Sequence, residues 1–244
     1  MKNQYFGDVG DFGKYGLLSA ILKSGLTLGI NWYLTPDELE KTDGKYIEYL
    51  NSIPEYDRCD PELYQFLQNK VSANKRDVEQ IKELPRFTNV PTYNEILDVS
   101  TVKVQHRLSM RRGWFQESIQ MLRGCNAIFM DPDNGIEVKS ALVTNRKSSK
   151  YVLHSEIEQL YSYGKSLIVY NHRDRSKESD YFKRIYCLRD LLENAQIIVL
   201  RFKRFSVRDY IFILQERHQD KIEKTIHHFL ESNWGRLFEL RSTD

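Results

Sequence analysis

The loop Asp131-Pro132-Asp133-Asn134-Gly135 places two carboxylates and an amide within a few residues of one another. It directly follows residues 127–130 (AIFM), a wholly apolar run that predicts a short buried strand. Ligands of parallel α/β sheets bind beyond the carboxyl ends of the strands, so the loop is expected at a functional site. Pro-Asp-Asn-Gly is also good β-turn chemistry and needs no function. We favour the functional interpretation because the two carboxylates directly follow a buried strand.

A second polar segment, residues 170–175 (YNHRDR), follows the apolar run at 166–170 (SLIVY). If the two strands are neighbours in the sheet, Asn171 and His172 lie beside the Asp131 loop. A histidine there could serve as a general base, a hydrogen-bond donor or a metal ligand. A solvent-facing histidine in a charged loop is the alternative.

The N-terminal segment at residues 5–16 (YFGDVGDFGKYG) is rich in glycine and precedes a helix predicted over residues 14–24. Backbone N–H groups at a helix N-terminus can bind anions. The segment is not GxGxxG after a strand, and it lacks the GK[ST] ending of a P-loop. The alternative is a capped N-terminal arm in which Asp11 serves the helix.

Basic and aromatic residues surround a predicted hairpin near the C-terminal end, namely Arg201, Phe202, Lys203, Arg204, Phe205 and Arg208. Arg111, Arg112, Arg173 and Arg175 would join them if the loops converge. Phosphate contacts combined with aromatic stacking suit nucleic acid. A hairpin tip with solvated charges is the alternative.

The elements that would position these groups are short apolar strands alternating with amphipathic helices. Strands are predicted at 28–34, 127–130, 166–170, 196–202 and 210–215, and helices at 14–24, 111–123, 156–163, 181–193 and 219–230. This alternation predicts a mostly parallel α/β sheet, and the short last connection predicts an antiparallel edge hairpin. Such an ending is characteristic of the Rossmann-like methyltransferase sheet.

Residues 36–106 interrupt this alternation with charged, helical stripes, and we expect a helical insertion within a single α/β domain spanning 1–244. One stripe contains Tyr46, and another follows a helix cap at Asp60. Residues 86–106 are expected to hold one or two short strands at most. Whether the insertion completes the sheet or forms a lid is left open.

The chain has 244 residues, a formal net charge of +2, 41% hydrophobic and 29% charged residues, all ordinary for one globular domain. The charge neither demands nor excludes a nucleic-acid partner, because local patches decide. The three widely spaced cysteines show no zinc pattern. No apolar run is long enough for a membrane span, and no signal peptide is visible, so we expect a cytoplasmic protein without membrane contact.

Gly7-Asp8-x-x-Asp11-x-x-Lys14, followed by a helix and a strand, resembles the N-terminal Gly-Asn-x-x-Asp-x-x-Lys segment of the RlmJ-type ribosomal RNA adenine-N6 methyltransferases. Asp131-Pro132-Asp133-Asn134 stands where that family has Asp-Pro-Pro-Tyr. The resemblance implies S-adenosylmethionine as cofactor, with Asp131 near the reacting atom. The residues expected near the cofactor are Gly7, Asp8, Asp11, Lys14, Tyr15, Thr35 and Asp37. The chain also looks like a bacterial group marked by YFGD and DPDNG, from which no activity follows.

Two departures separate the chain from that family. Thr35-Pro36-Asp37-Glu38 stands in place of the glycine-rich loop after the first strand. Asn134 replaces the aromatic residue that stacks on a flipped base, and a flipped base needs a stacking face. Tyr170, Phe129 or an N-terminal aromatic residue would have to supply it.

Three functions follow as hypotheses. The first is an S-adenosylmethionine-dependent methyltransferase acting on RNA or DNA, with Asp131, Asp133, Asn134 and His172 at the reaction centre. Its nucleic-acid contacts would be Arg173, Arg175, Arg201, Lys203, Arg204 and Arg208. The second is a nuclease or phosphodiesterase that holds Mg²⁺ or Mn²⁺ with Asp131, Asp133, Glu137 and His172. The third is a non-catalytic module that binds nucleic acid or a nucleotide. Nothing in the sequence points to an oligomeric state.

Overall fold

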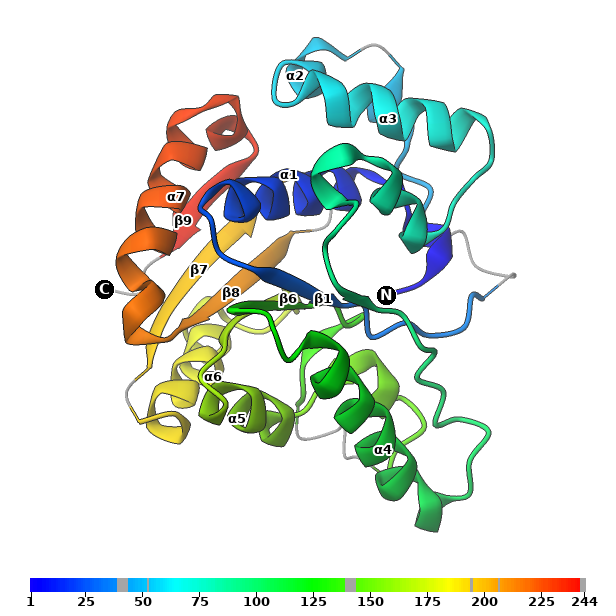
Figure 1. The fold of residues 1–244 in the computed structure, drawn as a ribbon, viewed down its shortest axis with the longest axis vertical. Coiled ribbons are helices and arrows are strands. Elements are labelled where there is room, and N and C mark those ends of the chain that lie inside the picture. Colours follow the sequence, from blue (N-terminus) through cyan, green and yellow to red (C-terminus); the bar gives the residue numbers. More distant parts are fainter. Residues whose placement is uncertain (39–43, 52, 139–143, 194, 206, 242–244) are drawn as a thin grey trace.

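The computed structural model describes residues 1–38, 44–51, 53–138, 144–193, 195–205 and 207–241. Its centre is a mixed sheet of seven strands in the order β2-β1-β3-β6-β8-β7-β9 (Figure 1). The strands are β1 (Leu28–Asn31), β2 (Thr92–Tyr93), β3 (Ala127–Met130), β6 (Ser166–His172), β7 (Gln196–Phe202), β8 (Arg208–Leu214) and β9 (Phe238–Arg241). The first four in the sheet order are parallel, whereas β8, β7 and β9 each run antiparallel to the preceding neighbour.

Helices cover both faces of this sheet (Figure 1). One face carries α1 (Val9–Lys23) and α7 (Gln219–Glu231), with α2 (Pro54–Asp57) and α3 (Pro61–Ser72) beyond α1. The opposite face carries α4 (Val104–Leu122), α5 (His154–Ser162) and α6 (Glu178–Leu191). A separate pair of short strands, β4 (Gly135–Ile136) and β5 (Tyr151–Val152), follows the Asp131 loop. The remaining elements are 3-10 turns at Asn3–Tyr5, Glu48–Leu50, Val78–Glu83, Pro85–Phe87, Ser148–Lys150, Glu216–His218 and Asn233–Arg236.

The position of a residue along its strand decides on which face of the sheet its side chain lies, because successive side chains point to opposite faces. Phe129 belongs to the core beneath α1, and its neighbours Ile128 and Met130 belong to the core beneath α4, α5 and α6. Asp131 lies two residues beyond Phe129 and therefore continues the α1 side. The same rule directs Arg208 of β8 to the α1 side and Arg201 of β7 to the opposite side.

The α/β class and the parallel core are confirmed, and the predicted bounds of β3 and β7 agree with the structure. The antiparallel C-terminal edge of the sheet is also as predicted, but it contains one strand more than the predicted hairpin. Strand β8 lies between β6 and β7, and β9, which carries no clear pattern in the sequence, covers β7. The inserted segment also contributes β2, which pairs with β1, so it completes the other edge of the sheet. Its residues 39–43 and 52 lie outside the described residues.

The helix caps agree with the prediction at one helix and correct it at another. Asp60 accepts a hydrogen bond from the backbone N–H of Leu63, as expected for the cap of α3. At α1 the cap is Asp8, whose carboxylate accepts the backbone N–H of Asp11 at 2.9 Å. The expectation that Asp11 caps this helix is wrong, because the helix already begins at Val9. In the described part of the chain, no helix is both long and apolar enough to cross a membrane.

Candidate active site

A buried lysine joins the N-terminal helix to the Asp131 loop. Lys14 Nζ lies 2.7 Å from Asp11 Oδ1 and 2.6 Å from Asp131 Oδ2. The side chains of Lys14 and Asp131 are only 3% and 1% exposed. Helical spacing puts Asp11 and Lys14 on one face of α1, and the strand order brings β3 beneath that face. The result is an ammonium shared by two carboxylates inside the protein.

Burial and charge act against each other in this cluster. Burial alone would lower the pKa of Lys14, but the two adjacent carboxylates outweigh it and raise that pKa well above its ordinary value. Burial also raises the pKa of Asp131, although Lys14 opposes this effect. Lys14 is therefore protonated at neutral pH and holds Asp131 in place by a charge-assisted hydrogen bond.

Asp133 is paired with a different cation, the amino group of Met1. The ammonium nitrogen lies 2.7 Å from Asp133 Oδ1 and also donates to the carbonyls of Tyr33 and Asp131, each at 3.1 Å. Lys150 Nζ approaches the other oxygen of Asp133 at 3.6 Å. Burial would raise the pKa of Asp133, but the ammonium group outweighs burial and lowers it. Asp133 therefore remains a carboxylate and fixes Met1 between the ends of β1 and β3.

A chain of hydrogen bonds sets the state of His172. Arg208 Nε donates to Tyr170 Oη at 2.5 Å, and Tyr170 Oη lies 3.2 Å from His172 Nε2. Because the tyrosine oxygen already accepts from Arg208, we assign its proton to the bond with Nε2 and the imidazole proton to Nδ1. Burial, and next the charge of Arg208, lower the pKa of His172 to about 4. The imidazole is therefore neutral at neutral pH, with Nδ1–H as a donor.

These groups face a cavity of about 290 Å³ at the carboxyl ends of β3 and β6, which we call the smaller cavity. Its lining combines buried carboxylates with buried cations. The lining residues are Met1, Tyr5, Asp8, Gly10, Asp11, Lys14, Gly44, Lys45, Tyr46, Asp131, Pro132, Asp133, Tyr170, His172 and Arg208. Both signs of charge thus meet in one partly buried cavity, where they interact more strongly than in water.

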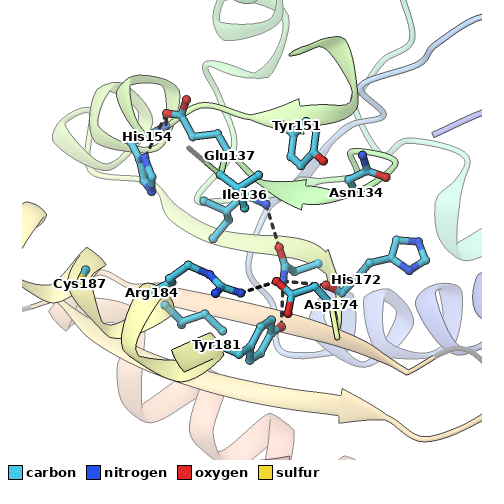
Figure 2. A pocket seen from close by; sticks show the side chains of 13 residues that line it. Asn134, Ile136, Glu137, Tyr151, His154, His172, Asp174, Tyr181, Arg184 and Cys187 are labelled. Carbon is cyan, nitrogen blue, oxygen red and sulfur yellow. Dashed lines mark hydrogen bonds and ion pairs between the residues drawn. The ribbon is translucent and has the colours of Figure 1, made fainter. Parts of the chain in front are cut away.

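A larger cavity of about 670 Å³ lies between the segment after the Asp131 loop and α6 (Figure 2). Figure 2 shows Asn134 and His172 at one end of it and the Glu137–His154 pair at the other. Apolar and aromatic side chains, including Ile136 and Tyr181, form much of its wall. Because His172 lines both cavities, the two spaces adjoin at this histidine.

The structure brings together only part of the expected cofactor set. Asp8, Asp11 and Lys14 line the smaller cavity, whereas Gly7, Tyr15, Thr35 and Asp37 do not. Tyr15 is fully buried and donates to Asp11, and Asp37 accepts the backbone N–H of Gln4. Thr35 contacts Asp133 at 3.3 Å from outside the cavity. At the N-terminus of α1, the backbone N–H of Asp11 is bonded to the carboxylate of Asp8.

Of the expected reaction-centre residues, Asp131 and Asp133 line the smaller cavity, Asn134 lines the larger one, and His172 lines both. Glu137 lies at the far end of the larger cavity and is paired with His154, whose Nδ1 is 3.1 Å from Glu137 Oε1. Within the described ranges, no three His, Cys, Asp or Glu side chains are grouped as metal ligands. The carboxylates of this site are instead neutralised by the protein's own cations.

The expected basic patch is divided between the surface and the interior. Arg201 is 8% exposed and forms a bidentate pair with Asp209, at 2.8 and 2.9 Å, so it is not a surface contact. Arg208 is also buried and lines the smaller cavity. Arg201 lies within β7 as predicted but is paired inside the sheet, and Arg208 begins β8 instead of lying in the connecting loop. Arg173, Arg175, Lys203 and Arg204 are at least partly exposed.

The sequence analysis missed Lys45 and Tyr46, which line the smaller cavity. It placed Tyr46 in the apolar stripe of a helix, but this residue lies outside any helix and is 38% exposed. The backbone carbonyl of Tyr46 accepts the N–H of Val9 at 2.9 Å, which fastens the segment to the start of α1. No local pattern could have revealed a contact between segments so far apart.

Neither the scan against protein-family models nor the search of curated proteins found a match for this chain.

Proposed function

We propose that this protein is an S-adenosylmethionine-dependent methyltransferase that acts on nucleic acid. The observation that carries the proposal is the pair of cavities beside the Asp131 loop, which adjoin at His172. Group transfer between two molecules requires both to be held next to each other, and two adjoining cavities can do this. A fold supports many chemistries, so the function follows mainly from the site and only secondarily from the sheet.

The sheet order agrees with a methyltransferase-type Rossmann-like fold. Strand β8 enters antiparallel between β6 and β7, and the Asp131 loop leaves the strand next to β6. In the RlmJ-type family, to which we propose a distant relationship, the aspartate of Asp-Pro-Pro-Tyr leaves a corresponding strand. Open α/β sheets bind ligands at the carboxyl ends of their strands, and both cavities lie there.

The lining residues fit the charged end of the cofactor. An amino-acid group carries an ammonium and a carboxylate, and the smaller cavity offers Asp8 for the first and Arg208 for the second. The larger cavity has the volume and the apolar wall that suit a nucleoside. S-adenosylmethionine supplies an electrophilic methyl group when it is bound.

Asp131 would orient the acceptor. Lys14 bonds its Oδ2, and none of the described residues donates a hydrogen bond to its Oδ1. This oxygen can accept a proton of an amino group and direct the nitrogen lone pair away from the carboxylate. Burial strengthens that hydrogen bond because water does not compete for it.

Two neighbouring polar groups would position the acceptor further. Neutral His172 presents Nδ1–H as a donor, rather than acting as the general base. Asn134 offers a side-chain amide at the end of the larger cavity and can both donate and accept. Such groups read the edge of a planar base and leave its faces for stacking.

The hydrolase alternative has less support. Asp131 and Asp133 are already paired with Lys14 and the Met1 ammonium group, and Glu137 is paired with His154. A divalent cation would have to displace Lys14 and the Met1 ammonium group from Asp131 and Asp133 before it could bind there. The non-catalytic alternative shares the same cavities and differs only in the absence of transfer.

The test is the thermal stability of the purified protein with S-adenosylmethionine, S-adenosylhomocysteine, Mg²⁺ or Mn²⁺. A ligand present at about 100 times its Kd stabilises by roughly 2.7 kcal/mol, which raises Tm by roughly 5–10 °C for a chain of this size. We expect such a rise with the two sulfur compounds in the presence of EDTA. We also expect transfer of labelled methyl groups from the cofactor to RNA or DNA.

Asp131→Asn is expected to abolish methyl transfer while cofactor binding persists. Asp190→Asn, which changes an exposed aspartate of α6, is the matched control and should leave both unchanged. A stabilisation by metal ions alone would favour the hydrolase. Cofactor binding without transfer to any nucleic acid would favour the binding module.

A further inference from the structure

The Asp131 loop has no aromatic side chain, and the aromatic residues of the two strands beside it, Phe129 and Tyr170, are buried. Phe129 is fully buried, and Tyr170 is 7% exposed and held by Arg208 and His172. A base that enters this site therefore needs a stacking face from elsewhere in the fold.

Two exposed rings meet at the rim of the smaller cavity. Tyr46 and Phe205, which we call the aromatic pair, have ring centroids 4.9 Å apart and an interplanar angle of 29°. They are 38% and 54% exposed, and Tyr46 lines the cavity. Single exposed apolar residues are common, but a stacked pair of rings beside a cavity leaves an outer ring face on which a planar group can stack.

The backbone holds both rings in place at a cost. Phe205 has a φ of +55°, a left-handed conformation that is unfavourable for a bulky side chain. Gly44, next to the segment of Tyr46, has a φ of +71°, and a Cβ there would lie 1.9 Å from the carbonyl oxygen of Gln4. Folding thus accepts a strained residue that exposes a phenyl ring instead of burying it.

Basic groups surround the aromatic pair. Lys45 is exposed, with its Nζ 5.7 Å from the ring centroid of Tyr46, and Lys203 precedes Phe205 by two residues. In the described structure, neither lysine has an ion-pair partner. The backbone N–H of Arg173 bonds the carbonyl of Val207, which joins a second basic loop to this one. Positive charge next to an aromatic face suits a base together with its phosphates.

We infer that the aromatic pair is a stacking platform for a base of a single-stranded nucleic acid at the mouth of the smaller cavity. This inference rests on the proposed function and specifies the form of its acceptor. A duplex keeps its bases stacked on one another, so it offers no free face to the pair. Lys45 and Lys203 bind the flanking phosphates, and the pair replaces the aromatic residue that the Asp131 loop lacks.

The test is fluorescence anisotropy with a short labelled single-stranded RNA and with the duplex of the same sequence, both without cofactor. Tyr46→Ala is expected to weaken single-strand binding by roughly 5- to 150-fold, the range for the loss of one base–aromatic stack. Tyr46→Phe should retain binding because it retains the ring. Tyr163→Ala, at another exposed tyrosine, is the matched control and should have no effect.

Two further measurements separate stacking from other causes. The salt dependence of binding should be unchanged in Tyr46→Ala, because its slope counts phosphate contacts. An unchanged Tm would confirm that the variant is folded. Equal affinity of the wild type and Tyr46→Ala for the single strand, or no binding by the wild type, would overturn the platform.

The cofactor experiment distinguishes this failure from failure of the proposed function. If RNA binding depends on Tyr46 but S-adenosylmethionine does not raise Tm, the platform is kept and methyl transfer is rejected. A rise in Tm with S-adenosylmethionine, without RNA binding that depends on Tyr46, would keep methyl transfer and reject the platform.

Discussion

Replacing Lys14 with methionine tests the shared ammonium at the centre of the site. The substitution preserves much of the apolar stem but removes the charge that lies 2.7 Å from Asp11 and 2.6 Å from Asp131. Both carboxylates are almost fully buried and would lose the cation that lies nearest to them. Removing one partner of a buried ion pair costs roughly 3–5 kcal/mol. At roughly 2–4 °C per kcal/mol for a chain of this size, Tm should fall by roughly 6–20 °C.

The loss should depend on pH in a defined direction. Burial already raises the pKa of Asp131, and removing Lys14 raises it further. The native variant then binds protons at a higher pH than its unfolded chain does. Its stability relative to the wild type therefore recovers as pH falls from 7 toward 5, because protonation neutralises the unpaired carboxylates.

Urea denaturation at several pH values measures both effects. Lys23→Met is the matched control, since Lys23 is an exposed residue at the end of the same helix. Adding Asp131→Asn to Lys14→Met should restore part of the stability, because an amide is cheaper to bury than an unpaired carboxylate. A loss below about 1 kcal/mol, within the range of a surface ion pair, would refute the shared-ammonium reasoning, as would a loss that does not change with pH.

Three further substitutions make separate predictions. In His172→Gln, we expect stability to fall less than in the wild type as pH drops from 6.5 to 4, because native His172, with a pKa of about 4, resists protonation while the unfolded chain accepts it. The difference approaches about 3 kcal/mol by urea denaturation. Arg111→Met should lower the free energy of unfolding by roughly 3–5 kcal/mol in the same assay. It removes the guanidinium whose Nε lies 2.7 Å from Glu156 Oε1 and so leaves that buried carboxylate without its ion-pair partner. Gly135→Ala should cost roughly 1–3 kcal/mol, because Gly135 has a φ of +125° and a Cβ would lie 1.8 Å from Asn171 Oδ1.

Each of these predictions has an outcome that contradicts it. A stability difference between the wild type and His172→Gln that is equal at pH 4 and pH 7 would rule out the assigned histidine state. An Arg111→Met loss that Glu156→Gln does not partly reverse would mean that the ion pair is not the cause. A Gly135→Ala variant as stable as the wild type would show that the loop accommodates a side chain there.

Local sequence determined much of the scaffold. The bounds of β3 and β7 follow from apolar runs ended by polar residues, and Asp60 was recognisable as a cap before Pro61. The alternation along β3 also places Asp131 on the face of Phe129, without any knowledge of what covers that face. These features depend on neighbours in the chain, so the sequence contains the information directly.

Tertiary packing decided the site. Arg201 and Arg208 looked equivalent in sequence, yet one is paired with Asp209 within the sheet and the other lines the smaller cavity. Strand β9 and the pairing of Tyr46 with Phe205 depend on segments far apart in the chain. Their positions follow from how the sheet, α1 and the inserted segment pack together, and no short-range periodicity records that packing.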